Sequence, residues 1–363
     1  MSGGIHATGV TNAYGILAWS QDSFATNPAT VRIGSLDGVV SANAAPEEGG
    51  IAAALCARTA TEVTLSSGGV LFGGTYGWDM GDGSATNAAS VLQALLAKVK
   101  ARTATVAESN TLVAAAIGGY AVLGGTGADT ICFSSENVAV FGQVALGGGD
   151  DTVMLSGIPS GRTLTLPTVT GAELLAITNC LDVAVSNAAS FVEVYVGSNA
   201  LCRLKDPSYT LSGLYGTGTV VPSGMLTVTN QIAVEQYEPA STGAVLTVTG
   251  GLVLGSGVSC HLRAVEVGDG LWTNDTVLVN GTLSVSGTGT IDLGCPTNAP
   301  IPLYQRQIVM RTTGGIVNPG ALTTWSLSGT GLDYDSKYLR IVRAEGKNVV
   351  VVLSRGGTVI TIL

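Results

Sequence analysis

The sequence predicts an all-β fold, a right-handed parallel β-solenoid (β-helix), with a distinct C-terminal β region from about residue 296. Short aliphatic runs alternate with polar residues and are separated by glycine, serine, threonine and asparagine, a pattern typical of strands and tight turns. Glycine accounts for 51 of the 363 residues, about twice its usual share. Several segments also resemble one another, which is typical of a structural unit stacked on copies of itself. An all-β sandwich assembly would give a similar pattern.

Composition and charge restrict the class of protein. Only 11% of the residues are charged, against roughly 25% in an average soluble domain. The net charge is −9 and the 16 basic residues form no cluster, so we expect no nucleic-acid partner. No run of about 18 apolar residues occurs, so no transmembrane segment is expected. Low lysine and abundant threonine, serine, glycine and alanine favour an extracellular or cell-surface location.

Residues 1–120 are predicted to form irregular N-terminal solenoid repeats. The run Ala57–Thr61 recurs letter for letter as Ala101–Thr105. Val91–Val99 fits a helix, because its apolar residues share one helical face. The repeat places Ile51–Leu55 in the equivalent position, and this favours a strand for Val91–Val99.

Residues 121–295 are predicted to form the solenoid coils. Their strands recur about every eight to twelve residues, a spacing that also allows a sandwich or a barrel. Asp129 is followed by Asp151, and Cys180 by Cys202, at the same 22-residue spacing. That spacing favours a solenoid, since it is about one turn of a three-faced parallel coil, and it predicts that Cys180 and Cys202 lie on adjacent turns. The predicted strands are Ala121–Leu123, Thr130–Phe133, Asn137–Phe141, Asp151–Leu155, Thr163–Leu166, Glu173–Thr178, Val183–Ser186 and Phe191–Val196.

Residues 296–363 are predicted to be a C-terminal β region that serves as an assembly end. The strands lengthen from about residue 240 onward. They are Ala244–Thr249, Leu252–Leu254, Asp275–Val279, Thr282–Val285, Thr290–Leu293, Arg306–Arg311, Leu339–Val342, Asn348–Leu353 and Thr358–Leu363.

One stretch carries a family resemblance. Asn274–Val285 reads as a strand, an Asn-Gly turn and a second strand, and Gly287–Gly294 continues with a glycine turn and another strand. This pattern resembles the autotransporter passenger-type β-helix repeat, and it covers residues 240–363 fairly well and 1–120 loosely. The resemblance implies a β-helix. The chain departs from the family in lacking its C-terminal membrane barrel and terminal aromatic residue, so export through a pore of its own is not expected.

Two glycine-rich turns are candidate calcium sites. Gly124–Ile131 resembles the GGxGxDxU nonapeptide of RTX-type β-rolls, and Leu146–Val153 resembles it with one glycine missing. Glycines with positive φ let carbonyl oxygens point inward, and aspartate supplies a hard anionic ligand for Ca²⁺. Asp129 and Asp151 are therefore the predicted metal ligands. The alternative is that these aspartates accept backbone N–H bonds in turns that close the coils.

The sequence predicts no catalytic residues and no cofactor apart from possible calcium. Polysaccharide-degrading β-helices need clustered carboxylates, often beside a cation. The acidic pairs are few: Glu47-Glu48, Asp150-Asp151 and Asp333/Asp335. Cys260 and His261 are adjacent, so their side chains should point to opposite faces of a strand. Two histidines and no Cys-x-x-Cys disfavour a zinc site.

Four isolated tryptophans allow two interpretations. They either provide a glycan-stacking surface or fill corners of the coils. They are Trp19, Trp78, Trp272 and Trp325.

The leading functional prediction is a structural extracellular or cell-surface protein that self-assembles end to end into a fibre or layer. The chain ends on an apolar β-branched strand, which would be buried if a neighbouring copy received it. The assembly residues are Thr358, Val359, Ile360, Thr361, Ile362 and Leu363. The alternative is a surface adhesin or glycan-binding β-helix passenger, and a polysaccharide-degrading enzyme is the weakest reading.

Overall fold

The computed structural model divides into two compact units, Met1–Phe191 and Val192–Leu363. The domain boundaries expected near residues 120 and 295 stay predictions. The residues that the structure describes are 4–9, 12–18, 31–36, 38–44, 51–57, 61–66, 68–74, 76, 88–186, 188, 190–234, 243–268, 271–294, 306–329 and 338–355.

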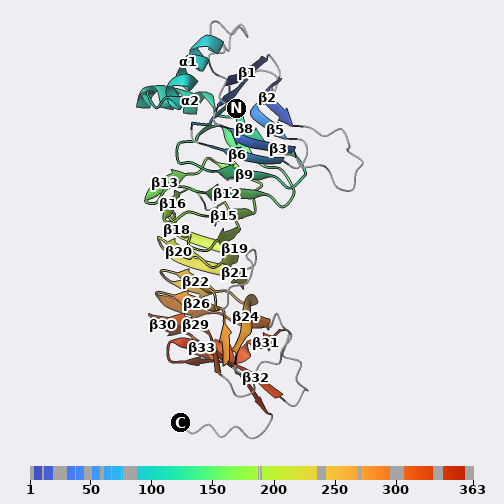
Figure 1. The fold of residues 1–363 in the computed structure, drawn as a ribbon, viewed down its shortest axis with the longest axis vertical. Coiled ribbons are helices and arrows are strands. Elements are labelled where there is room, and N and C mark those ends of the chain that lie inside the picture. The colour runs from blue at the N-terminus through green and yellow to red at the C-terminus, as the bar shows by residue number, and fades with distance from the viewer. Residues whose placement is uncertain are drawn as a thin grey trace. The chain divides into compact units, whose positions relative to one another are not determined.

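Both units are mostly β, and most of their strand pairs are parallel, which confirms the prediction at that level (Figure 1). Antiparallel pairs also occur in the second unit. There β24 (Val258–Gly268) pairs with β25 (Leu271–Asn274), and β33 (Asn348–Arg355) pairs with β29 (Arg306–Thr312) and β32 (Tyr338–Glu345).

In the first unit, strands that are distant in the chain pair in parallel within several sheets. One sheet has the order β1 (Gly4–Gly9), β4 (Val39–Ala44), β7 (Val70–Gly74) and β10 (Ala139–Phe141). A second has the order β14 (Val169–Thr170), β11 (Gln143–Ala145), β8 (Tyr120–Leu123), β5 (Ile51–Ala57) and β2 (Asn12–Ala18). A third contains β3 (Val31–Leu36), β6 (Thr61–Leu65), β9 (Thr130–Phe133), β12 (Thr152–Ser156) and β15 (Leu174–Thr178), and β13 (Arg162–Thr165) pairs with β16 (Val183–Ser186).

The 22-residue register is present in the third of these sheets. Thr130 pairs with Thr152, and Thr152 pairs with Leu174, with parallel strands throughout. Side chains alternate between buried and partly exposed along these strands, so Val153 and Leu155 lie in the core. Two-residue alternation is the pattern that the sequence shows at these positions, which is why the predicted strands here match the observed ones closely.

The segment predicted as a strand at Val91–Val99 is a helix, so that prediction was wrong. Helices α1 (Ala88–Lys100) and α2 (Val106–Ala115) lie between β7 and β8. Leu92 and Leu96 are one helical turn apart, and both are buried in a cluster with Phe72 of β7. Packing of this apolar helix face on the sheet outweighs the loose repeat that favoured a strand.

The exact five-residue repeat is also not a structural repeat. Thr61 begins strand β6, whereas Thr105 caps helix α2 by accepting the N–H of Glu108, whose carboxylate accepts the N–H of Thr105. The strand residue that lies opposite Thr61 is Val31 of β3, which is not part of the repeat. Identity over five residues therefore did not indicate equal positions in the stack.

Close backbone approach explains the Gly-Gly pair that ends β7. A Cβ atom on Gly73 would lie 1.8 Å from the carbonyl oxygen of Tyr120, at the start of β8. Only glycine fits there without moving one of the two strands.

In the second unit, one group of paired strands comprises β17 (Glu193–Val196), β19 (Ser208–Gly216), β21 (Met225–Ala233), β23 (Leu252–Leu254), β27 (Thr282–Val285) and β30 (Gly315–Val317). Attached to it are β24 (Val258–Gly268), β25 (Leu271–Asn274), β28 (Gly289–Gly294) and β31 (Ser326–Ser328). Another group comprises β18 (Leu201–Leu204), β20 (Thr219–Pro222), β22 (Val245–Val248), β26 (Thr276–Val279), β29 (Arg306–Thr312), β33 (Asn348–Arg355) and β32 (Tyr338–Glu345). A short 3₁₀ helix, η2, spans Pro319–Thr324.

The spacing between paired residues is irregular in this unit. Glu193 pairs with Gly213, 20 positions on, and Leu252 pairs with Leu283, 31 positions on. A constant 22-residue period therefore does not extend through the chain. The predicted assembly strand, Thr358–Leu363, lies outside the described residues.

Candidate functional site

The two predicted metal ligands lie in a row of carboxylates on the first unit, which we name the carboxylate ladder: Asp129, Asp151 and Glu173. Each lies immediately before a strand, namely β9, β12 or β15, and neighbouring carboxylates are 22 residues apart in the chain. Asp129 Oδ1 accepts the backbone N–H of Thr61 at 2.8 Å. Asp151 Oδ1 accepts the N–H of Asp129 at 2.7 Å, and Glu173 Oε2 accepts the N–H of Asp151 at 2.8 Å. Each carboxylate thus caps the start of the preceding strand in the stack.

Burial makes ionisation of the two aspartates in the ladder unfavourable. Asp129 is 2% exposed and Asp151 is 0% exposed. Burial, opposed by the Thr61 N–H bond and reinforced by the charge of Asp151, raises the pKa of Asp129 to about 6. Burial, with the charges of Glu173 and Asp150, also raises the pKa of Asp151. Asp151 Oδ2 has no hydrogen-bond partner within the part of the chain that the structure describes.

The ladder can hold a proton or a cation at that unpaired oxygen. Both carboxylate oxygens of Asp129 already accept N–H groups, Oδ1 from Thr61 and Oδ2 from Gly125 at 3.4 Å. In the described ranges no group of three or more histidine, cysteine, aspartate or glutamate side chains is arranged to hold a metal ion. The calcium prediction is left open by this geometry.

The calcium prediction has a direct test. A ligand that binds only the folded state stabilises it by mass action, so removal of a shared ion by excess chelator should lower the melting temperature. Calcium added back should restore it, while magnesium at the same concentration should not. An unchanged melting curve in chelator would contradict the calcium prediction and would mean that Gly124–Ile131 and Leu146–Val153 are turns without a bound ion.

The second unit repeats the capping arrangement with an added cation. Asp275, 1% exposed at its side chain, precedes β26 and accepts the N–H of Ala244, which precedes β22, at 3.0 Å. Its carboxylate also pairs with the Arg263 guanidinium, Nε to Oδ2 at 2.9 Å. The charge of Asp275 is therefore compensated, in contrast with that of Asp151.

The other residues singled out by sequence lie apart. Trp325 is buried, and its Nε1 donates to the Gly287 carbonyl, so it fills a corner of the second unit. Cys260 is buried, whereas its neighbour on β24, His261, lies 2.8 Å from Asp292 Oδ2 through its Nδ1. This confirms that the two side chains point to opposite faces of the strand. Trp19, Trp78, Glu47-Glu48 and Asp333/Asp335 lie outside the described residues.

The cysteine prediction spans the two units. Cys180 belongs to the first unit and Cys202 to the second, so adjacency of the pair stays a prediction. Both are thiols, as are Cys56, Cys132 and Cys260. Burial raises the pKa of the Cys180 thiol and raises that of Cys260 to about 12. Neither is set up as a thiolate nucleophile.

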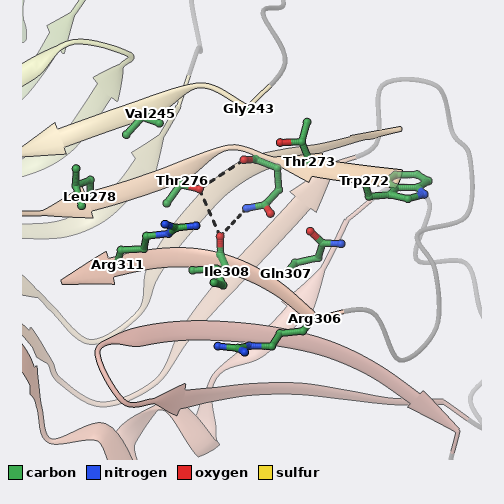
Figure 2. Close-up of a pocket in the computed structure, with 11 residues that line it drawn as sticks. Gly243, Val245, Trp272, Thr273, Thr276, Leu278, Arg306, Gln307, Ile308 and Arg311 are labelled. Carbon is green, nitrogen blue, oxygen red and sulfur yellow. Dashed lines mark hydrogen bonds between the residues drawn. The ribbon is translucent and has the colours of Figure 1, made fainter. Parts of the chain in front are cut away.

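Trp272 lines a pocket of about 530 Å³ in the second unit (Figure 2). The other polar and charged residues at its wall come from β25, β26 and β29: Thr273, Asn274, Thr276, Arg306, Gln307 and Arg311. Figure 2 shows Trp272 and Arg311 on opposite sides of the pocket, with Ile308 between them and Arg306 below. We name this feature the Trp-Arg pocket.

Diverging strands create the Trp-Arg pocket. β26 pairs with β29 from Val277 opposite Met310 onward, but the preceding β25 turns away and pairs with β24. Asn274 spans the resulting gap, because its Nδ2 donates to the Ile308 carbonyl at 2.8 Å. The wall is therefore fixed by the protein's own hydrogen bonds.

Sequence reasoning found Trp272 but not the two arginines. Arg306 and Arg311 stood within a predicted strand and gave no signal, because the divergence of β25 from β29 is not visible in the sequence.

Comparison with protein-family models gives no match, and comparison with curated proteins gives none. Within the described residues, the structure contains no helix that is both long and apolar enough to span a membrane.

Proposed function

We propose that this chain is a structural extracellular or cell-surface protein whose copies associate end to end into a fibre or layer. The proposal takes the scaffold to be a right-handed parallel β-solenoid related to the autotransporter passenger-type repeat. It assigns no catalytic reaction. The observation that carries it is the set of edge strands at the start of the first unit.

β1, β2 and β3 each form the outermost described strand of a sheet. Among the described strands, β1 pairs with β4, β2 with β5 and β3 with β6, each on one side. An edge strand presents backbone N–H and C=O groups to any chain that can add a strand. These three strands follow one another in the chain, and each leaves one edge unpaired among the described strands. Together they could receive strands from the end of a second copy.

The side chains on this edge support the same conclusion. Leu17 of β2 is 47% exposed, although it is a large aliphatic residue on a strand. Edge strands that must not pair with a second molecule usually carry lysine, proline or a β-bulge in natural proteins. β2, with the sequence NAYGILA, carries neither lysine nor proline. A neighbouring copy would bury this apolar surface.

The proposal predicts a specific effect of truncation. Deletion of Thr358–Leu363 should leave a folded protein that no longer forms polymers, because the strand offered to the neighbour is removed. A control that changes Thr358 and Thr361 to serine keeps the apolar residues and should polymerise. Sedimentation and electron microscopy give the readout. Normal polymers from the truncated chain would contradict the role of this strand.

A second candidate, a glycan-binding surface protein, is favoured by the Trp-Arg pocket. It is compatible with assembly, since a fibre can display binding sites along its length.

A further inference from the structure

The Trp-Arg pocket has a composition unlike that of the chain as a whole. The chain carries a net charge of −9 and has 16 basic residues. The pocket wall nevertheless contains two arginines, and none of its lining residues is acidic. Because Glu345 compensates the charge of Arg306, Arg311 is the positive group of this wall that can attract an anion.

We propose that the Trp-Arg pocket binds a carboxylated saccharide, that is, a glycan containing a uronic acid or a similar acidic sugar. The inference goes beyond the assembly function and does not depend on it. A pocket of about 530 Å³ lies within the size range of small-molecule sites, roughly 300–1,000 Å³.

Arg311 supplies the contact expected for the carboxylate. It is exposed at the pocket wall and forms no ion pair with any described residue. A guanidinium can hold a carboxylate by two parallel N–H···O bonds, which gives direction as well as affinity. Arg306 differs, because its Nε is bound to Glu345 Oε2 at 2.8 Å. That ion pair compensates its charge, and it lies below the pocket in Figure 2, so Arg311 is the arginine left to bind an anion.

Trp272 supplies the contact expected for a sugar ring. An indole combines a large flat apolar face with one polar N–H, which suits the apolar face of a pyranose. Because Trp272 and Arg311 lie on opposite sides of the pocket, one ligand reaches both only if it is longer than a single carboxylate (Figure 2). This separates an acidic oligosaccharide from a simple anion.

The floor between these two contacts is polar and already organised. Asn274 Nδ2 donates to the carbonyls of Asp275 and Ile308, and Thr276 Oγ1 lies 3.4 Å from the Ile308 carbonyl oxygen. These bonds hold the wall without a ligand, so binding needs little reorganisation. The Thr273 hydroxyl at the rim is a further group that can bond sugar hydroxyls.

Calorimetric titration with a matched pair of sugars tests the proposal. The full chain should bind trigalacturonate and bind galactotriose, its neutral counterpart, at least tenfold more weakly. Arg311→Gln should weaken trigalacturonate binding at least tenfold, equivalent to about 1.4 kcal/mol. Trp272→Ala should weaken binding of both sugars. Arg162→Gln, an exposed arginine on the first unit, is the control and should bind like the unchanged chain.

Three results would overturn the proposal. One is absence of trigalacturonate binding at millimolar concentration. Another is equal affinity for the charged and neutral sugars, which would make the site a neutral-glycan site. The third is equal competition by inorganic phosphate, which would reduce the pocket to a simple anion site. Melting curves of each variant establish that it is folded, and because Arg311 is exposed, its loss should leave the melting temperature unchanged.

Discussion

Asp151→Asn is expected to stabilise the protein at pH 7, in the presence of chelator, by about 1–2 kcal/mol. Asp151 is fully buried, and its Oδ2 has no partner among the described residues. An ionised carboxylate in that position keeps the desolvation penalty of an unmatched charge. Asparagine retains Oδ1 to accept the N–H of Asp129 and replaces the charged Oδ2 by a neutral amide group. Its N–H donors also lack a described partner, but a neutral group costs less to bury than a full charge.

The gain should depend on pH in a defined direction. The pKa of Asp129 is raised to about 6, and that of Asp151 is also raised, chiefly by burial. The folded state therefore binds protons more tightly than the unfolded chain, whose aspartates have pKa values near 4. This stabilisation is complete below about pH 4 and is lost as the pH rises through the folded-state values. The difference between Asp151→Asn and the unchanged chain should be largest at neutral pH and vanish toward pH 4.

Denaturant unfolding at a series of pH values in chelator measures this difference. Asp150→Asn is the matched control, because it removes a charge one residue away at an exposed position, where that charge is the smallest of the causes that raise the pKa of Asp151. It should change the free energy of unfolding by less than about 0.5 kcal/mol. If Asp151→Asn destabilises the protein at neutral pH, the unpaired oxygen has a partner that asparagine cannot replace.

Leu17→Lys is expected to raise the concentration needed for assembly at least tenfold, equivalent to about 1.4 kcal/mol. Leu17 is 47% exposed on the edge strand β2, so lysine is tolerated in the single chain. Binding of a second copy to this edge would bury the new charge. Burial of an ammonium group without a partner destabilises the complex by several kcal/mol.

Met225→Lys gives the control for that substitution. Met225 is also an exposed apolar residue, 52% exposed, but its strand β21 pairs with β19 on one side and with β23 and β24 on the other. A charge there lies away from any sheet edge and should leave assembly unchanged. Equal effects of both substitutions would mean that net charge, and not the edge, governs association.

The strands of the central region could be predicted because the local pattern determines them. Thr130–Phe133, Val183–Ser186, Leu252–Leu254 and Thr282–Val285 match β9, β16, β23 and β27 residue for residue. Each is flanked by turn residues, and β9, β23 and β27 also show alternating burial, so the signals lie within a few positions.

Features that depend on tertiary packing could not be predicted. Val91–Val99 is predicted as a strand but forms part of helix α1, because the buried cluster around Phe72 that stabilises the helix is formed by distant residues. Glu173 was missed as the third member of the carboxylate ladder, although it follows Asp151 at the same 22-residue spacing. Glu173 lies outside the glycine-rich aspartate turns, so its local sequence gives no sign of a role in the ladder.

Electron microscopy of the purified full-length chain at increasing concentration tests the central claim most directly. Association through the terminal strands predicts polymers or layers that appear above a threshold concentration, with copies joined at their ends. Particles that remain single copies at the highest concentration reached would contradict end-to-end assembly.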